Sequence, residues 1–247
     1  MSSMLLIGDL RKTYRQAAEP TLQGLTLQFP SHCIAGLLGP NGAGKTTTIS
    51  IISGLVRADS GSVEVLGLDS SRQAEQIKKK IGVVPQSIAL YPTLSARENL
   101  EYIGRLYRIP KTALREKIDR YLELFGLEKN AHKAIRHYSG GMRRRANIIA
   151  SLLHDPELLI LDEPTAGVDV QSRNMILDFL RQYHREGHSI LYTSHLLEEA
   201  QQLCEEIAIM DHGRLVVQGN PAALMQAHGC QSLEQVFLQV TGWGLRD

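Results

Sequence analysis

The sequence lacks any uninterrupted apolar run that approaches the ~20 residues with which a helix crosses a bilayer. Its start, Met1-Ser2-Ser3-Met4, also lacks the basic flank and the long apolar stretch of a signal peptide. Cysteine is scarce, because Cys33, Cys204 and Cys230 are far apart and have no metal-ligand spacing. We therefore expect a globular protein of the cytoplasm with free thiols and no membrane span of its own.

Neither sign of charge dominates. The 247 residues include 27 Lys and Arg against 26 Asp and Glu, which leaves a formal net charge of +1. This balance gives no reason to expect a nucleic acid or an acidic surface as a partner. The chain is long enough to bury a substantial core, either as one large domain or as two small ones.

The residues Gly39-Pro40-Asn41-Gly42-Ala43-Gly44-Lys45-Thr46 match the phosphate-binding loop pattern of Gly, four residues, Gly, Lys and Ser or Thr. The apolar run 33–38 before the loop predicts a buried strand, and residues 47–52 after it predict a helix. Glycines let backbone N–H groups converge on phosphate oxygens, while the helix directs its positive end at them. In such a loop Lys45 reaches the β and γ phosphates, and Thr46 is placed to bind Mg²⁺. The alternative is a glycine-rich turn with an exposed lysine, but a chance match is on the order of one per cent.

The remaining pattern indicates an α/β protein with a helical insertion. Alternating apolar residues within 4–29 predict strands with one buried face, and residues 81–85 predict a buried strand stopped by proline. Ser95 and Glu98 then form a capping box, which predicts the start of a helix. From about 87 to 155 the spacing is mainly helical.

Two acidic residues follow an aliphatic run at the end of a predicted strand. Residues 158–161 predict a central strand buried on both faces, and ligands bind at the carboxyl ends of such strands. Asp162 can hold Mg²⁺ directly or through water, and Glu163 can polarise an attacking water. The strand predicted at 189–193 ends near His195. A lone histidine is usually structural, but this position favours a role in the same site.

The segment Tyr138-Ser139-Gly140-Gly141-Met142 precedes another predicted helix, whose N-terminus is a second candidate anion site. A plain N-cap with a glycine turn is the alternative hypothesis. Arg143, Arg144 and Arg145 fall in the first turn, where cations oppose the helix dipole. They would be better placed if an anionic ligand lay in front of the helix.

Taken together, these motifs resemble the nucleotide-binding subunit of an ATP-binding cassette (ABC) transporter over nearly the whole chain. In chain order they match Walker A (39–46), the Q-loop glutamine (Gln86), the signature sequence (138–142), Walker B (158–162) with the catalytic Glu163, the D-loop (166–169) and the switch histidine (His195). Tyr138 and Met142 replace the usual Leu and Gln of the signature. This variant, and the ending 232–238, resemble the separate ATPase subunits of ABC-2-type exporters.

The resemblance implies ATP and Mg²⁺ as cofactors and assigns residues to them. The implied nucleotide-binding residues are Tyr14, Gly39, Asn41, Gly42, Ala43, Gly44, Lys45, Thr46, Thr47, Ser139, Gly140 and Gly141. The implied metal ligands are Thr46, Gln86 and Asp162, and the implied catalytic residues are Lys45, Glu163 and His195. Tyr14 would stack on adenine. Ser139 and Gly141 would contact the γ-phosphate of an ATP held by the opposite subunit.

The implied fold is an α/β P-loop NTPase with a mainly parallel central sheet, an N-terminal antiparallel β subdomain and a helical insertion. Residues 1–247 would form a single ABC ATPase domain. Its parts would be a core (1–86 and 156–219), a helical subdomain with the signature (87–155) and a C-terminal helical extension (220–247). In that extension, Ser232 and Gln235 predict a second capping box.

The implied function is an ATPase subunit that dimerises around two ATP molecules and powers a transporter, with export favoured. It would sit on the cytoplasmic face of the membrane through a separately encoded integral permease, whose contacts would select the substrate. A homodimer and a heterodimer with a related ATPase subunit both stay open, and no nucleic acid partner is expected. An ABC ATPase acting on ribosomes or DNA is the main alternative, disfavoured because the chain has neither two cassettes nor a long heptad insertion. A module that binds ATP without turnover is the third.

Overall fold

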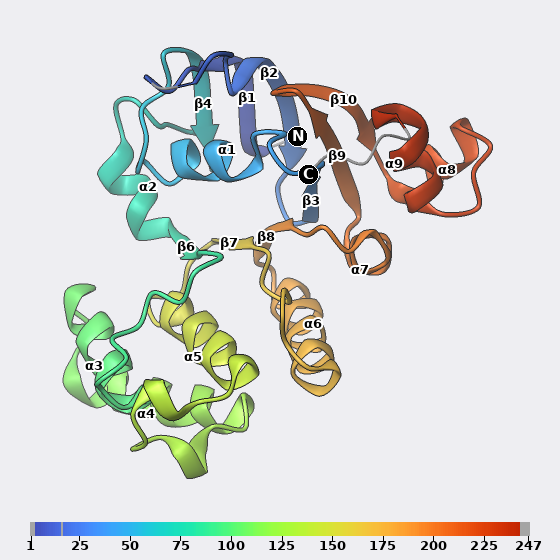
Figure 1. Cartoon of the computed structure of the whole chain (residues 1–247). Helices are drawn as coiled ribbons and strands as arrows, with labels where there is room; N and C mark the ends of the chain where they lie inside the picture. Colours follow the sequence, from blue (N-terminus) through green and yellow to red (C-terminus); the bar gives the residue numbers. More distant parts are fainter. Residues whose placement is uncertain (1–2, 16, 243–247) are drawn as a thin grey trace.

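The chain folds around two β-sheets, as the computed structural model of residues 3–15 and 17–242 shows (Figure 1). The first sheet is antiparallel, with strand order β2-β1-β4-β5. Its strands are β1 (Ser3–Lys12), β2 (Leu22–Pro30), β4 (Ser60–Val65) and β5 (Leu68–Asp69). This sheet confirms the antiparallel unit predicted near the N-terminus.

The second sheet has the order β10-β9-β3-β8-β7-β6. Its strands are β3 (Ile34–Leu38), β6 (Ile81–Val84), β7 (Leu158–Asp162), β8 (Ser189–Thr193), β9 (Glu206–Asp211) and β10 (Arg214–Gly219). All neighbours pair in parallel except β9 and β10, which are antiparallel. The mainly parallel sheet is therefore confirmed, and the carboxyl ends of β3, β7 and β8 meet at one edge.

Some helices pack against this sheet, and others form a separate group below it in the view of Figure 1. They are α1 (Lys45–Ile52), α2 (Ala74–Lys80), α3 (Ala96–Leu106), α4 (Lys111–Leu124), α5 (Gly140–Leu152), α6 (Val170–Arg185), α7 (Leu197–Leu203), α8 (Pro221–Ala227) and α9 (Leu233–Thr241), with short 3₁₀ turns η1 (Glu128–Asn130) and η2 (Ile135–His137). Over the described ranges, none of these helices combines the length and apolarity that a bilayer span requires.

Strand β7 shows how the sheet separates two hydrophobic cores. Leu158 and Ile160 pack with the antiparallel sheet, α1 and α2, whereas Leu159 and Leu161 pack with α3 to α6 on the opposite face. All four side chains are fully buried. The predicted strand with two buried faces is thus present, and it carries Asp162 at its carboxyl end.

The helical segment between β6 and β7 starts as its sequence predicts. Ser95 caps α3 through its side chain, and Glu98 bonds back to the Ser95 backbone, so the capping box is complete. Gly104 lets α3 approach α4 closely, because a Cβ there would lie 2.2 Å from Leu114 Cδ1. The division of the chain at 86, 155 and 219 into core, helical subdomain and extension stays a prediction.

At the C-terminal end, α8 and α9 lie beside β10, and α9 also packs on α7 (Figure 1). The second predicted capping box is only half correct. Ser232 caps α9 by accepting from Gln235 N, but the Gln235 side chain accepts from Gln231 N instead of Ser232 N. The last residues of the predicted extension, 243–247, lie outside the described residues.

The burial of two thiols predicts selective alkylation. Burial raises the pKa of Cys33 to about 12 and also raises that of the fully enclosed Cys204, so neither forms a thiolate near neutrality. Cys230 is only half-buried. We expect N-ethylmaleimide at pH 7.5 to modify Cys230 and to spare the other two, as measured by peptide mass spectrometry, with all three modified in guanidinium. Labelling of Cys33 in the native protein would contradict this placement.

Candidate active site

The phosphate-binding loop joins β3 to α1 and depends on glycine geometry. Gly42 and Gly44 have φ angles of 80° and 101°, which side chains other than glycine rarely adopt. Gly44 is the N-cap of α1, and a Cβ there would lie 2.7 Å from Leu22 Cδ2 and 3.0 Å from Thr21 O. Glycine at position 44 is therefore required both by the backbone and by the contact with β2.

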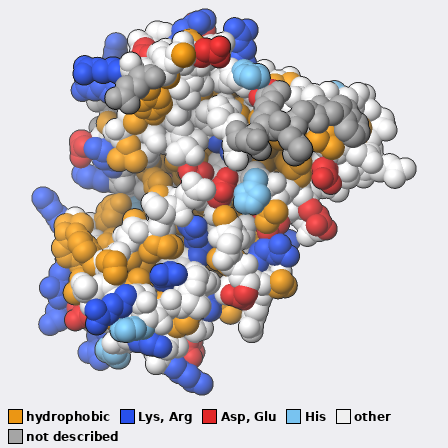
Figure 2. Space-filling model, viewed as in Figure 1, with side chains coloured by type: hydrophobic (Ala, Val, Ile, Leu, Met, Phe, Trp, Pro, Cys, Tyr) orange, Lys and Arg blue, Asp and Glu red, His pale blue; other side chains and the backbone are white. Residues whose placement is uncertain are grey.

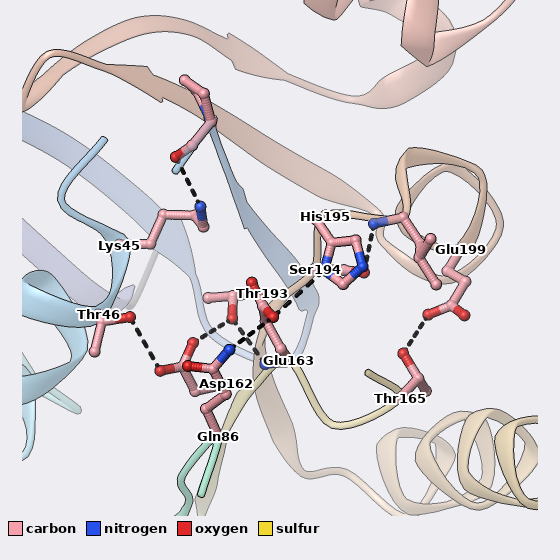
Figure 3. Close-up of polar contacts among 12 residues, drawn as sticks. Lys45, Thr46, Gln86, Asp162, Glu163, Thr165, Thr193, Ser194, His195 and Glu199 are labelled. Atoms are coloured by element: carbon pink, nitrogen blue, oxygen red, sulfur yellow. Dashed lines mark hydrogen bonds and ion pairs between the residues drawn. The ribbon is translucent and has the colours of Figure 1, made fainter. Parts of the chain in front are cut away.

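Lys45 begins α1 and points back into the loop (Figure 3). Only 7% of the residue is exposed, and its Nζ donates to Gly39 O at 2.7 Å and to Pro40 O at 3.0 Å. Burial lowers the pKa of the Lys45 ammonium, while the carboxylates of Glu163 and Asp162 oppose that shift. Because carbonyls are weaker partners than phosphate oxygens, this buried cation is ready to exchange them for an anion.

Asp162 connects three elements at the carboxyl edge of the sheet. Its Oδ2 accepts from Thr46 Oγ1 of α1 at 3.3 Å, and its Oδ1 accepts from Thr193 Oγ1 of β8 at 2.8 Å (Figure 3). The last residues of β7 and β8 are paired in register, which brings Thr193 beside the carboxylate. The result is a set of oxygen donors of the type that Mg²⁺ prefers, in which Asp162 and Thr193 are buried and Thr46 is exposed.

Glu163 directly follows β7 with a φ of 50°, a left-handed conformation. Its backbone N–H donates to both oxygens of Thr193, at 3.2 Å to the carbonyl and 3.0 Å to Oγ1, which fixes the turn. The side chain is 14% exposed, and one oxygen, Oε2, accepts from Gln86 Nε2 at 3.1 Å and lies 3.3 Å from His195 Nδ1. The structure thus brings Gln86, Glu163 and His195 together (Figure 3).

Other predicted nucleotide contacts border the loop. Tyr14 is 40% exposed, with its hydroxyl 3.5 Å from Thr47 Oγ1 and its ring 5.7 Å from Lys12 Nζ. Its ring therefore offers an open face next to the first turn of α1. Asn41 is exposed on the loop, while Ala43 is buried beneath it.

The segment 138–142 lies at the start of α5. Ser139 is the N-cap, and its Oγ accepts from Met142 N at 3.2 Å. A Cβ on Gly141 would lie 2.2 Å from Ser172 Oγ, so glycine there permits close packing against α6. Within the described residues, no hydrogen bond joins 139–141 to the phosphate loop.

An anionic ligand in front of α5, which would favour the three arginines of its first turn, stays a prediction, but two of these arginines already have protein partners. Arg144 is buried and donates to Pro85 O and Gln86 O, and Arg145 donates to Phe125 O at 2.5 Å. Backbone carbonyls of neighbouring loops therefore accept hydrogen bonds from these two cations. The helix dipole alone does not predict these hydrogen bonds, because their acceptors lie on other segments of the chain.

Comparison with known proteins decides the family. A family model described as ABC transporter matches residues 22–166. This chain belongs to the ABC transporter family.

Relatives of this ABC ATPase are similar along most of their length. The linearmycin resistance ATP-binding protein LnrL of Bacillus subtilis (strain 168) is 43% identical over 233 residues, which are 94% of this chain and 74% of the relative. The Nod factor export ATP-binding protein I of Ralstonia nicotianae is 38% identical over 232 residues, 94% and 72% of the two chains. A solved ATP-binding subunit of an ABC transporter superposes with a TM-score of 0.87 at 26% identity, covering 96% of this chain and 99% of that one. The chain is accordingly an enzyme that binds and hydrolyses ATP.

Sequence reasoning missed the contacts of three polar residues around the ABC site. Thr193 holds the Glu163 backbone and the Asp162 carboxylate, and Arg144 holds the Gln86 loop. Glu199 of α7 is buried, and its Oε2 accepts from Thr165 Oγ1 at 2.7 Å and from Tyr192 OH at 2.6 Å, which ties the residue before the D-loop to β8. Only the register between strands and the packing of helices reveal these contacts, and neither is encoded in a local motif.

Proposed function

We propose that this ABC ATPase pairs head to tail with a second ATPase subunit, encloses two ATP molecules and powers an exporter. The observation that carries the proposal is the separation of two complete half-sites in one chain. Lys45, Glu163 and His195 gather at the phosphate loop, whereas the capped N-terminus of α5 at Ser139 makes no hydrogen bond to that loop in the described part of the chain. Two copies, or one copy and a related subunit, would complete both sites.

In this mechanism the loop of one subunit holds the triphosphate. Backbone N–H groups of 41–47 and the Lys45 ammonium bind the phosphates, and Lys45 gives up its bonds to Gly39 O and Pro40 O for them. Tyr14 stacks on the adenine through its exposed ring face. The Ser139 helix of the opposite subunit approaches the γ-phosphate with its positive end.

Glu163 acts as the base that orients or deprotonates water, and His195 steadies the γ-phosphate. In the resting chain both His195 and Gln86 lie against the same Glu163 oxygen. Their partial release toward the nucleotide frees that oxygen for water. Thr46, Asp162 and Gln86 offer the oxygen donors that would hold Mg²⁺, which supplies positive charge to the phosphates.

A groove beside the Gln86 loop supports a membrane permease as the partner. It has a volume of about 340 Å³ and is lined by Leu55, Pro85, Ile103, Tyr107 and Asn147, among others. Leu55 is 77% exposed, and Figure 2 shows hydrophobic side chains gathered over α3 and the adjoining edge of the core. Within the described chain, Asn147 Nδ2 is buried with no hydrogen-bond partner. A permease segment with an apolar face and a free carbonyl fits this lining.

Docking through this groove would place the subunit on the cytoplasmic face of the membrane as a peripheral component. The names of the two relatives, one for resistance and one for export, support export as the direction. Because the groove binds the permease and not the cargo, the transported substrate follows from the permease alone. The balanced net charge gives no support to a nucleic acid partner.

The groove predicts a specific loss of membrane association. We expect tagged wild-type chain to sediment with membranes of its own cells, and Leu55→Asp to stay in the supernatant, because the charge must be desolvated in the interface. Leu124→Asp, at an exposed leucine of α4 outside the groove, is the matched control and should sediment normally. Sedimentation with ribosomes or DNA that resists high salt would instead support a non-transport ABC ATPase.

A further inference from the structure

Arg144 is a buried cation without a carboxylate partner in the described structure. The residue is 6% exposed, and its Nη1 and Nη2 donate to two consecutive carbonyls, Pro85 O at 2.9 Å and Gln86 O at 2.7 Å. Burial lowers the pKa of its guanidinium, while Asp162 and Glu163 favour the charged form. Burying an arginine costs free energy of desolvation. If this position only had to be filled, an apolar side chain would therefore give a more stable protein. We therefore infer that the function of Arg144 is to bind the carbonyls of Pro85 and Gln86.

The loop that carries Gln86 depends on α5 for its position. Beyond β6, residues 85–88 make no backbone–backbone hydrogen bonds within the described chain. Two α5 side chains hold this loop: Arg144 binds its first two carbonyls, and Asn147 Oδ1 accepts from Ala89 N at 3.1 Å. A shift of α5 would therefore carry the loop with it.

The same loop reaches the catalytic carboxylate. Gln86 accepts from Arg144 through its backbone and donates through its side chain to Glu163 Oε2 at 3.1 Å. Ser139 lies five residues before Arg144 on the same helix, roughly 7.5 Å along its axis. Helix α5 thus connects Ser139, which would contact the ATP held by the partner subunit, with Gln86, which lies at the ATP site of its own subunit.

We propose that Arg144 is the positioning residue that couples the two ATP sites of the dimer. When the tip of α5 engages the γ-phosphate held by the partner subunit, Arg144 transmits the helix position to Gln86 and so sets Glu163 in its own site. Pro85, the other residue bound by Arg144, also lines the groove proposed for the permease, so the same contact links that groove to hydrolysis. This inference rests on the composite-site dimer proposed above.

Arg145 provides a control with the same chemistry and a different target. It lies on the same helix and donates to Phe125 O, at the end of α4, and at 3.4 Å to Gly141 O one turn earlier in α5, but not to the Gln86 loop. Loss of its bonds should loosen the helical segment without disturbing Gln86. Comparing the two arginines therefore separates positioning from general stability.

The test measures hydrolysis and loop protection in the full chain. A lysine at 144 can satisfy only one carbonyl well, so Arg144→Lys should lower kcat by about tenfold with an unchanged KM for ATP. We also expect the Hill slope for ATP to fall toward one and the affinity of the subunit for a fluorescent ATP analogue to be unchanged. Arg144→Met should lower kcat further and speed hydrogen exchange in 85–89, whereas Arg145→Lys should lower the Tm and leave kcat and slope unchanged.

An equal decrease of kcat in the Arg144→Lys and Arg145→Lys variants would overturn the positioning role. A normal kcat in Arg144→Met would overturn it as well. Hydrogen exchange is informative even in an inactive variant, and unchanged exchange at 85–89 in Arg144→Met would overturn the role as well. If the wild type hydrolyses ATP as a monomer with a slope of one, the dimer proposal fails and with it the coupling. The effect of Arg144 on kcat would then still decide whether it positions Gln86 within one chain.

Discussion

Replacing Glu163 by glutamine should reduce ATP hydrolysis by about 10²–10⁴-fold, the usual contribution of a general base. ATP binding should persist, because the phosphate contacts come from the loop and Lys45 rather than from this side chain. The amide keeps the shape and one oxygen of the carboxylate but cannot accept a proton from water. With hydrolysis slowed, the nucleotide-bound dimer should accumulate. Phosphate release measures the rate, and size exclusion with light scattering in ATP measures the dimer.

Glu157→Gln is the matched control for this experiment. Glu157 lies just before the opposite end of β7, six positions earlier, and its carboxylate accepts from Lys80 Nζ at 2.7 Å on the surface. Because exposed ion pairs contribute little stability, this variant should hydrolyse ATP at the wild-type rate. Full turnover by Glu163→Gln would remove Glu163 from the proposed role.

The parts of the fold that local patterns encode were predictable from sequence. The aliphatic run 158–161 predicts a strand with two buried faces, and Ser95 with Glu98 predicts the start of α3. The phosphate loop needs no distant residue to be recognised, because its glycines and Lys45 follow a fixed spacing.

What escaped prediction depends on contacts between distant segments. Thr193 reaches Asp162 only because β7 and β8 pair in a particular register. Arg144 finds its partners on a loop some 58 residues earlier in the chain. Gln235 is a local exception, because its side chain accepts from Gln231 N and not from the Ser232 N that a capping box would use. Residue spacing predicts contacts within one helix, strand or loop. The hydrogen bonds of Thr193 and Arg144 depend instead on which groups tertiary packing brings within reach.

A mixing experiment tests whether each ATP site is shared between two subunits. Lys45→Ala removes the buried cation of the phosphate loop. Ser139→Asp keeps α5 intact, because Asp is as good an N-cap as Ser, but it places a negative charge where the γ-phosphate of the neighbour should bind. Each variant alone should lose nearly all hydrolysis. Ser232→Asp makes the same N-cap change on α9 and should leave the rate unchanged.

Mixing the two inactive variants in equal amounts should restore hydrolysis to at most about a quarter of the wild-type rate, because coupling through Arg144 would slow the one intact site of a mixed dimer. Half of the random dimers are then mixed, and each mixed dimer has one site in which an intact Lys45 meets an intact Ser139. The other site carries both defects. Phosphate release from the mixture, compared with the summed rates of the separate variants, gives the result. If each ATP were gripped within a single chain, no pairing could unite the two intact parts, and the mixture would stay at that sum.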